Sequence, residues 1–237
     1  MKKILIIFMF LFLLTGCGKN NNELVMVTEA GFAPYEYYED GKIVGVDVDI
    51  AEEIAKKMGK KLVIKDVAFD SIINEVKSNK SDFGAAGISY SEEREKEVDF
   101  SINYTTSKQV VVIKKDSGIT IDNLDGKKIA VQLGSIGDGY VTSNYKKSEI
   151  VRQKKYLQAI EDLKSDKVDC VVMDELPALE FVKVNDNLMV LDKELTSDSY
   201  GMIVKKGNTE LLNTINEVLN ELKDNGKIDE FIINHTK

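Results

Sequence analysis

Short apolar runs and amphipathic segments alternate along most of the chain. Four to seven apolar or alternating residues are typical of a strand, whereas apolar residues three and four positions apart are typical of a helix. Strands are predicted at 24–27, 61–67, 82–87, 127–133 and 168–174, and helices at 48–58, 69–78, 156–164, 176–182 and 211–233. This alternation predicts parallel strands covered by helices, and its restart near residue 127 predicts two lobes.

The first 22 residues have another pattern and are predicted to lie outside the fold. Two lysines precede an apolar run at 4–14 that is too short to span a bilayer and has the layout of an export signal. The run ends in LTGC, which resembles the lipobox of bacterial lipoproteins. Residues 1–16 are then a signal peptide and 17–22 a tether, lipidated at Cys17 and anchored in the cell membrane. The alternative is an ordinary signal peptide with an incidental cysteine.

Composition excludes several classes of function. The 237 residues have a formal net charge of −8, or −10 once the two lysines of the signal peptide are removed, which argues against a nucleic-acid partner. A single histidine, His235, and two distant cysteines disfavour a zinc site and a Ser-His or Cys-His nucleophile. No nucleotide-binding motif is present. The sequence therefore predicts no cofactor and no metal, and Cys170 is expected to be a buried core thiol.

Five segments carry a resemblance to a known family. They are GFAPYEYYEDGKIVGVDVDIAEEIAKKMGKK, FDSIINEVKSNKSD, GISYSEEREKEVDFS, LDGKKIAVQLGSIGD and VDCVVMDELPA. In order and spacing they resemble the amino-acid-binding, family 3 extracellular solute-binding proteins of bacterial ABC importers. The resemblance implies an α/β, two-lobed clamp of periplasmic-binding-protein type II, in which each lobe has a mostly parallel sheet flanked by helices. The implied first lobe is 23–105 plus 200–237 and the second is 106–199, with hinge strands at 105–110 and 198–203.

The resemblance also implies a function and its partners. A monomer on the extracytoplasmic face of the membrane would capture an amino acid by closing its lobes and would deliver it to an ABC permease, without enzymatic chemistry. Two alternatives stay open. One is an enzyme on the same fold, similar to periplasmic cyclohexadienyl dehydratase, with Glu29 and Asp174 as acid and base. The other is a sensor that binds the same ligand and feeds no importer.

Arg94 is one of only two arginines among 32 basic residues. A guanidinium binds a carboxylate through two parallel hydrogen bonds, which an ammonium group cannot do, so Arg94 is expected to anchor the ligand carboxylate. Ser91 is a plausible N-cap for the turn that holds Arg94, and Ser89 matches the family's hydroxyl position. The alternative is a surface arginine paired with the glutamates at 92, 93 or 95.

The resemblance assigns the ligand ammonium to Asp174, at the end of a predicted strand, and to the carbonyl of Gly87. Asp174 is also a candidate N-cap of the following helix, and both roles can hold together. The second-lobe loop contains Gly134, Ser135 and Ile136, where the family pattern is Gly-Ser/Thr-Thr. Ile136 has no side-chain donor, so only its backbone N–H remains available for the ligand carboxylate.

Side-chain selectivity is assigned to four further residues. Glu29 matches an acidic position that meets the far end of the ligand, with a solvated loop carboxylate as the alternative. Phe32 and Phe69 would flank the ligand, although Phe69 is equally consistent with a core residue at a helix start. Gln132 would line the pocket from the second lobe. The predicted ligand is a polar L-amino acid, with a cationic one slightly ahead of cystine or glutamine.

Overall fold

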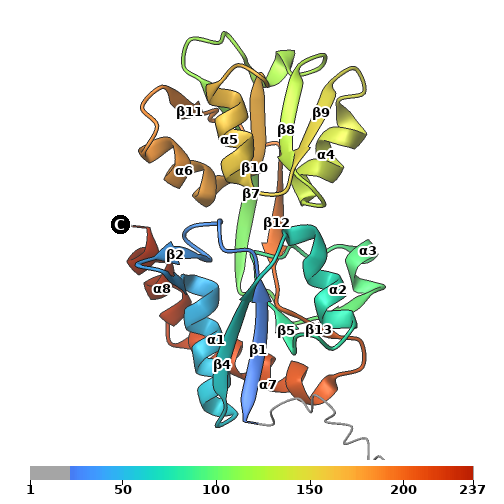
Figure 1. Ribbon diagram of the computed structural model, residues 1–237, viewed down its shortest axis with the longest axis vertical. Coiled ribbons are helices and arrows are strands. Elements are labelled where there is room, and N and C mark those ends of the chain that lie inside the picture. The colour runs from blue at the N-terminus through green and yellow to red at the C-terminus, as the bar shows by residue number, and fades with distance from the viewer. Residues whose placement is uncertain (1–21, 237) are drawn as a thin grey trace, which may run out of the picture.

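The computed structural model describes residues 22–236 as two lobes joined by a pair of strands (Figure 1). The first lobe, at the bottom of Figure 1, contains a five-stranded sheet in the order β4-β1-β5-β13-β6. Its strands are β1 Glu23–Thr28, β4 Lys61–Asp66, β5 Phe83–Gly84, β6 Val98–Phe100 and β13 Ile203–Lys205. A separate hairpin, β2 Tyr37–Glu39 and β3 Lys42–Val44, lies beside it.

Helices cover this sheet and bury an apolar stripe against it. They are α1 Val46–Lys57, η1 Phe69–Ser71, α2 Ile72–Lys77, α3 Glu92–Glu95, α7 Thr209–Asp224 and α8 Lys227–His235. Along α7 the buried residues are Leu211, Ile215, Val218, Leu219 and Leu222, which follow the spacing of one helical face. This face packs on α1, where Ile50 and Ile54 are fully buried.

The second lobe contains a six-stranded sheet in the order β11-β7-β10-β8-β9, with β12 also paired to β7. Its strands are β7 Thr105–Lys114, β8 Lys128–Gln132, β9 Glu149–Gln153, β10 Cys170–Asp174, β11 Leu188–Val190 and β12 Thr196–Tyr200. The helices are η2 Ile121–Asn123, α4 Ile136–Asn144, α5 Tyr156–Lys164 and α6 Glu175–Lys183. All five residues of β10 are buried because helices cover both faces of the sheet, and Cys170 is a free thiol there, as expected.

Parallel pairing, which the sequence predicts, is found on one side of each sheet. In the first lobe β1 runs parallel to β4 and β5, and in the second β8 runs parallel to β9 and β10. The remaining pairs, formed by β13 and by β7, are antiparallel because these strands run back across the lobes. Each sheet is therefore mixed, within the two-lobed α/β clamp that the sequence predicts.

Two expected elements differ in detail. The helix predicted over 211–233 is interrupted at Gly226, whose φ of 67° is a left-handed conformation that ends α7 and lets α8 turn back onto α1. The strand predicted over 198–203 is also divided. Residues up to Tyr200 belong to β12 and those from Ile203 to β13, in different sheets. The connection between the lobes is thus the antiparallel pair β7 and β12, from Thr105 opposite Tyr200 to Gln109 opposite Thr196.

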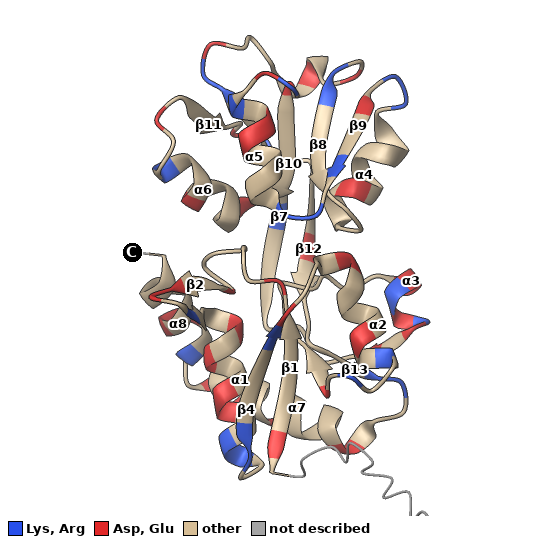
Figure 2. Cartoon of the chain, in the orientation of Figure 1, with Lys and Arg blue, Asp and Glu red and all other residues tan. Residues whose placement is uncertain are grey.

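Charged residues of both signs are distributed over both lobes. In the view of Figure 2, blue and red segments alternate along the outer helices and loops of each lobe. This distribution agrees with the acidic composition of the chain. Within residues 22–236, no helix combines the length and the apolar character needed to cross a bilayer.

Candidate ligand-binding site

All ten residues predicted to bind the ligand line one cavity between the lobes. They are Glu29, Phe32, Phe69, Gly87, Ser89, Arg94, Gln132, Ser135, Ile136 and Asp174, and the cavity wall also includes Glu36, Ala86 and Tyr156. The cavity has a volume of about 10 Å³, which is room for about one water molecule. An amino acid can therefore enter only when the lobes move apart.

Arg94 is held at this cavity by α3. Ser91 caps the helix, as expected, by accepting a hydrogen bond of 3.2 Å from the backbone N–H of Arg94. Arg94 is 9% exposed, and its guanidinium lies over the ring of Phe69, 5.5 Å from the ring centroid. Among the described residues no carboxylate lies within ion-pair distance of it, so the alternative of a surface arginine paired with nearby glutamates is wrong.

The hydrogen bonds of Arg94 join the two lobes. Its guanidinium donates to the carbonyl of Ser89 at 2.6 Å in the first lobe and to the carbonyl of Gly134 at 2.8 Å in the second. Both acceptors are neutral, whereas a carboxylate adds an opposite charge and can accept two parallel hydrogen bonds from one guanidinium. A carboxylate that reached this position would therefore be a better partner for Arg94 than either carbonyl.

Asp174 ends β10 and points its carboxylate toward the strands that join the lobes. Its Oδ1 accepts hydrogen bonds from Ser107 at 3.0 Å, from Gln109 at 2.8 Å and from the hydroxyl of Tyr200 at 2.6 Å. Asp174 occupies the N-cap position of α6, as expected, but its side chain makes no capping hydrogen bond. Burial raises the pKa of Asp174 to about 7, and the charge of Asp198 adds to this rise in pKa.

Asp198 on β12 accepts a hydrogen bond from the hydroxyl of Ser89, which was expected to face the ligand. Ser89 donates to Asp198 at 2.8 Å, and Gln109 donates to the other carboxylate oxygen at 3.2 Å. Burial raises the pKa of Asp198, whereas the hydrogen bonds from Ser89 and Gln109 lower its pKa. The hydroxyl of Ser89 is thus committed to a second carboxylate beside the cavity.

Glu29 forms the other end of the cavity. Gln132 donates to its Oε2 at 3.1 Å, and the ammonium group of Lys155 lies 3.0 Å from its Oε1. The side chain of Glu29 is 2% exposed, so the alternative of a solvated loop carboxylate is wrong. Burial raises the pKa of Glu29, and the contact with Lys155 lowers that pKa.

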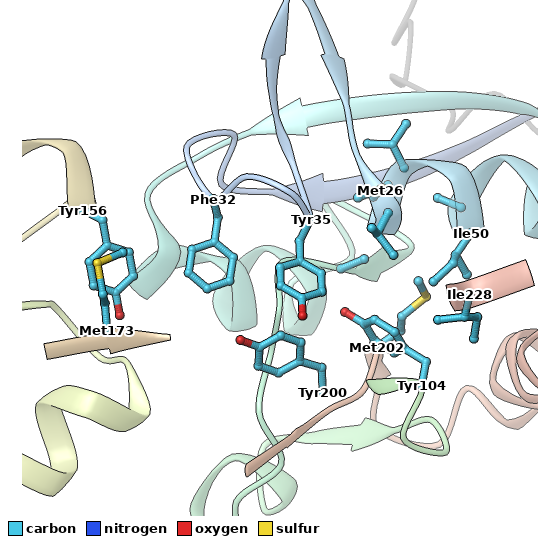
Figure 3. Close-up of a cluster of buried hydrophobic side chains, with 14 of the residues drawn as sticks. Met26, Phe32, Tyr35, Ile50, Tyr104, Tyr156, Met173, Tyr200, Met202 and Ile228 are labelled. Atoms are coloured by element: carbon cyan, nitrogen blue, oxygen red, sulfur yellow. The ribbon is translucent and has the colours of Figure 1, made fainter. Parts of the chain in front are cut away.

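Aromatic rings form the wall between these polar ends. Phe32 stacks on Tyr35 of its own lobe and on Tyr156 of the second lobe, with ring centroids 5.8 Å apart in each pair (Figure 3). Gly87 packs against Phe32, where a Cβ would lie 2.5 Å from the ring, and its φ of 53° also requires glycine. Phe69 packs against a core cluster of the first lobe, and its ring also lies under Arg94 at the cavity.

The sequence reasoning missed two buried acids, Asp47 behind the cavity and Glu36 in its wall. Asp47 accepts hydrogen bonds from the hydroxyl of Tyr104 at 2.6 Å and from the backbone N–H of Gly87 at 3.0 Å, and burial raises its pKa to about 6. Burial and the neighbouring Asp47 raise the pKa of Glu36 well above its ordinary value. The pattern VDVD gives no sign that its first aspartate is buried, because its partners lie far along the chain. In the described part of the chain no three potential ligands are placed to hold a metal ion.

Comparisons with known proteins agree with this geometry. A model of bacterial extracellular solute-binding proteins, family 3, matches residues 24–235. The arginine-binding extracellular protein ArtP of Bacillus subtilis is 34% identical over 92% of this chain and 91% of its own. The L-cystine-binding protein TcyJ of Escherichia coli is 29% identical over 89% and 81%. The structure of AbpA from Streptococcus pneumoniae, bound to L-arginine, has a TM-score of 0.87 and is 34% identical over 91% of this chain and 94% of that one.

The raised pKa of Asp174 predicts a pH-dependent stability. Because the carboxyl titrates at about 7 when folded and near 3.8 when unfolded, the folded state binds more protons between these values, and the free energy of unfolding falls as pH rises. Asp174→Asn removes this dependence while keeping an acceptor for the three donors. Relative to the wild type, the free energy of unfolding of the variant is therefore expected to rise between pH 4 and pH 8, by on the order of 4 kcal/mol. Urea unfolding of both proteins across this pH range measures the difference in free energy of unfolding. A difference that does not change with pH would contradict the prediction.

Proposed function

The chain belongs to family 3 of the bacterial extracellular solute-binding proteins, and from this premise we propose that it captures a cationic L-amino acid, with L-arginine as the first candidate, for an ABC importer. The observation that carries the proposal is the convergence of Arg94, Asp174 and Glu29 on one interlobe cavity. A guanidinium and a carboxylate match the two charges of a free amino acid, and the remaining carboxylate matches a positively charged side chain.

The charge balance of the cavity favours a cation over a neutral ligand. The carboxyl groups that line it or lie directly behind it are those of Glu29, Glu36, Asp47, Asp174 and Asp198, and the cations that contact it are Arg94 and Lys155. Buried carboxylates are costly without partners, so a ligand that brings a net positive charge is preferred and an acidic side chain is rejected. The arginine named for ArtP and AbpA is consistent with this preference.

Capture follows from lobe closure and needs no covalent step. The first lobe, which we place at 23–105 plus 200–237, would take the ligand carboxylate at Arg94. The second lobe, 106–199, would then bring Asp174 to the ammonium group, together with the carbonyl of Gly87, and would bring Gln132 to the side chain. The protein would act in this way as a monomer. The closed form would be the one that the permease binds.

We also propose that the protein is held at the extracytoplasmic face of the membrane through Cys17. This residue and the predicted signal peptide lie outside the described residues, and the lipobox-like LTGC motif supports the proposal. Cys17→Ala is expected to abolish incorporation of labelled palmitate in growing cells and to leave the protein unprocessed or released. Label that persists in the variant would contradict an anchor at Cys17.

The ligand class is tested by thermal unfolding in the presence of each of the twenty common amino acids. A ligand that binds only the folded clamp raises the transition temperature, and we expect L-arginine to give the largest shift and L-glutamate none. Mass spectrometry of the compound released from purified, denatured protein gives an independent identification. A largest shift with glutamate or aspartate contradicts the role of Glu29, and one with leucine or valine contradicts a polar pocket.

Arg94→Lys is expected to weaken ligand binding without unfolding the protein. Lysine keeps the charge but loses the planar pair of donors, so we expect a loss of about 2 kcal/mol or more, close to 30-fold in Kd. Calorimetric titration with the amino acid identified above measures it.

Arg152→Lys is the matched control for this experiment. Arg152 lies on β9 and donates to Asp138 at 2.9 Å and to Thr142 at 2.8 Å, outside the enclosed cavity. This variant is expected to bind within about twofold of the wild type, because exposed ion pairs are worth little. Equal affinities for the two variants would show that Arg94 is not the anchor.

A further inference from the structure

Glu29 already forms an ion pair with a cation of the protein itself. The ammonium group of Lys155 lies 3.0 Å from Oε1 of Glu29 and 3.5 Å from Oδ2 of Asp66. With Gln132 on Oε2, both oxygens of Glu29 contact side chains of the second lobe. The position that the proposed function gives to the ligand's cationic group is therefore one for which Lys155 competes.

The three charged groups differ in how much water they reach. The side chain of Glu29 is 2% exposed, that of Asp66 25% and that of Lys155 38%. Glu29 needs a cation whenever the lobes are closed, because a buried carboxylate without a partner is costly. Lys155 has no such need, because its flexible stem reaches both solvent and the more exposed Asp66.

The backbone at Lys155 is held in place, and its ammonium group lies between two carboxylates. Lys155 is the residue that precedes α5, and the next residue, Tyr156, is fully buried and stacks on Phe32 across the lobe interface. Asp66 is also held in place, because its Oδ1 accepts a hydrogen bond of 2.9 Å from the backbone N–H of Ala30. Lys155 can thus exchange Glu29 for Asp66 by a side-chain rotation, without opening the clamp.

We propose that Lys155 is a specificity-determining residue that acts as a displaceable counter-ion of Glu29. A ligand with a cationic side chain takes Glu29 and leaves Lys155 to Asp66, whereas a ligand with a neutral side chain leaves the pair of Glu29 and Lys155 intact. Lys155 therefore narrows the preference for cationic over neutral ligands of the same shape. This inference rests on the proposed function.

The test compares L-arginine with its neutral isostere L-citrulline by calorimetric titration. In the wild type both are expected to bind, with arginine tighter. Lys155→Met removes the competing cation, so citrulline would leave Glu29 unpaired, and we expect the ratio of the two Kd values to rise about tenfold. Lys155→Arg keeps a cation and should keep the ratio within about twofold of the wild type.

Lys154→Met is the matched control, since it removes the neighbouring lysine, which is exposed and makes no ion pair with any described carboxylate. It should leave the ratio unchanged, and thermal unfolding without ligand checks that each variant folds. An equal loss of affinity for both ligands in Lys155→Met would show that Lys155 only holds the lobes together, and would overturn the inference. An unchanged ratio of the two Kd values in this variant would also overturn it. So would wild-type protein that binds arginine but not citrulline. Wild-type protein that binds another amino acid but not arginine contradicts the proposed function instead.

Discussion

Compensation of buried charge across the lobe interface is the constraint on which this structure depends. The cavity wall removes several carboxyl groups and one guanidinium from water, and each costs several kcal/mol unless it is paired or hydrogen-bonded. The first lobe cannot satisfy its own groups. Arg94 needs the carbonyl of Gly134, and Glu29 needs Lys155 and Gln132, all from the second lobe. Closing the lobes and neutralising the cavity are therefore one event, and any ligand that enters must replace these contacts.

The strands between the lobes take part in the same charge network. Ser107 and Gln109 on β7 and Tyr200 on β12 hold the carboxylate of Asp174, and β12 also supplies Asp198. The segment that must bend when the clamp opens is thus hydrogen-bonded to the proposed ammonium site. A positive charge placed at Asp174 favours the ionised carboxylate and with it the hydrogen bonds that fix these strands, which links occupancy to the closed conformation.

Local signals and long-range contacts explain what the sequence could and could not reveal. The helix predicted over 156–164 agrees with α5 residue for residue, because its apolar spacing reports one buried face. The helix predicted over 211–233 is broken at Gly226, where a backbone conformation overrides an otherwise helical pattern. The ten cavity residues were found through motif order, not through periodicity. Lys155 and Asp47 were missed because their partners, Glu29 and Gly87, belong to distant segments that only the tertiary fold brings together.

Ile136 shows how a departure from the family pattern can be compensated. It is the first residue of α4, so its backbone N–H has no intrahelical acceptor, while the hydroxyl of Ser135 is engaged by the N–H of Asp138 at 3.1 Å. The isoleucine side chain borders both the enclosed cavity and an outer groove of about 770 Å³. A side-chain donor is lost at this position, and Arg94, which lines both the cavity and the groove, is the side chain left to donate to a carboxylate there. Arg94 therefore has to bind the ligand carboxylate without help from a side chain at position 136. This agrees with the presence of an arginine here in a chain that otherwise relies on lysine for positive charge.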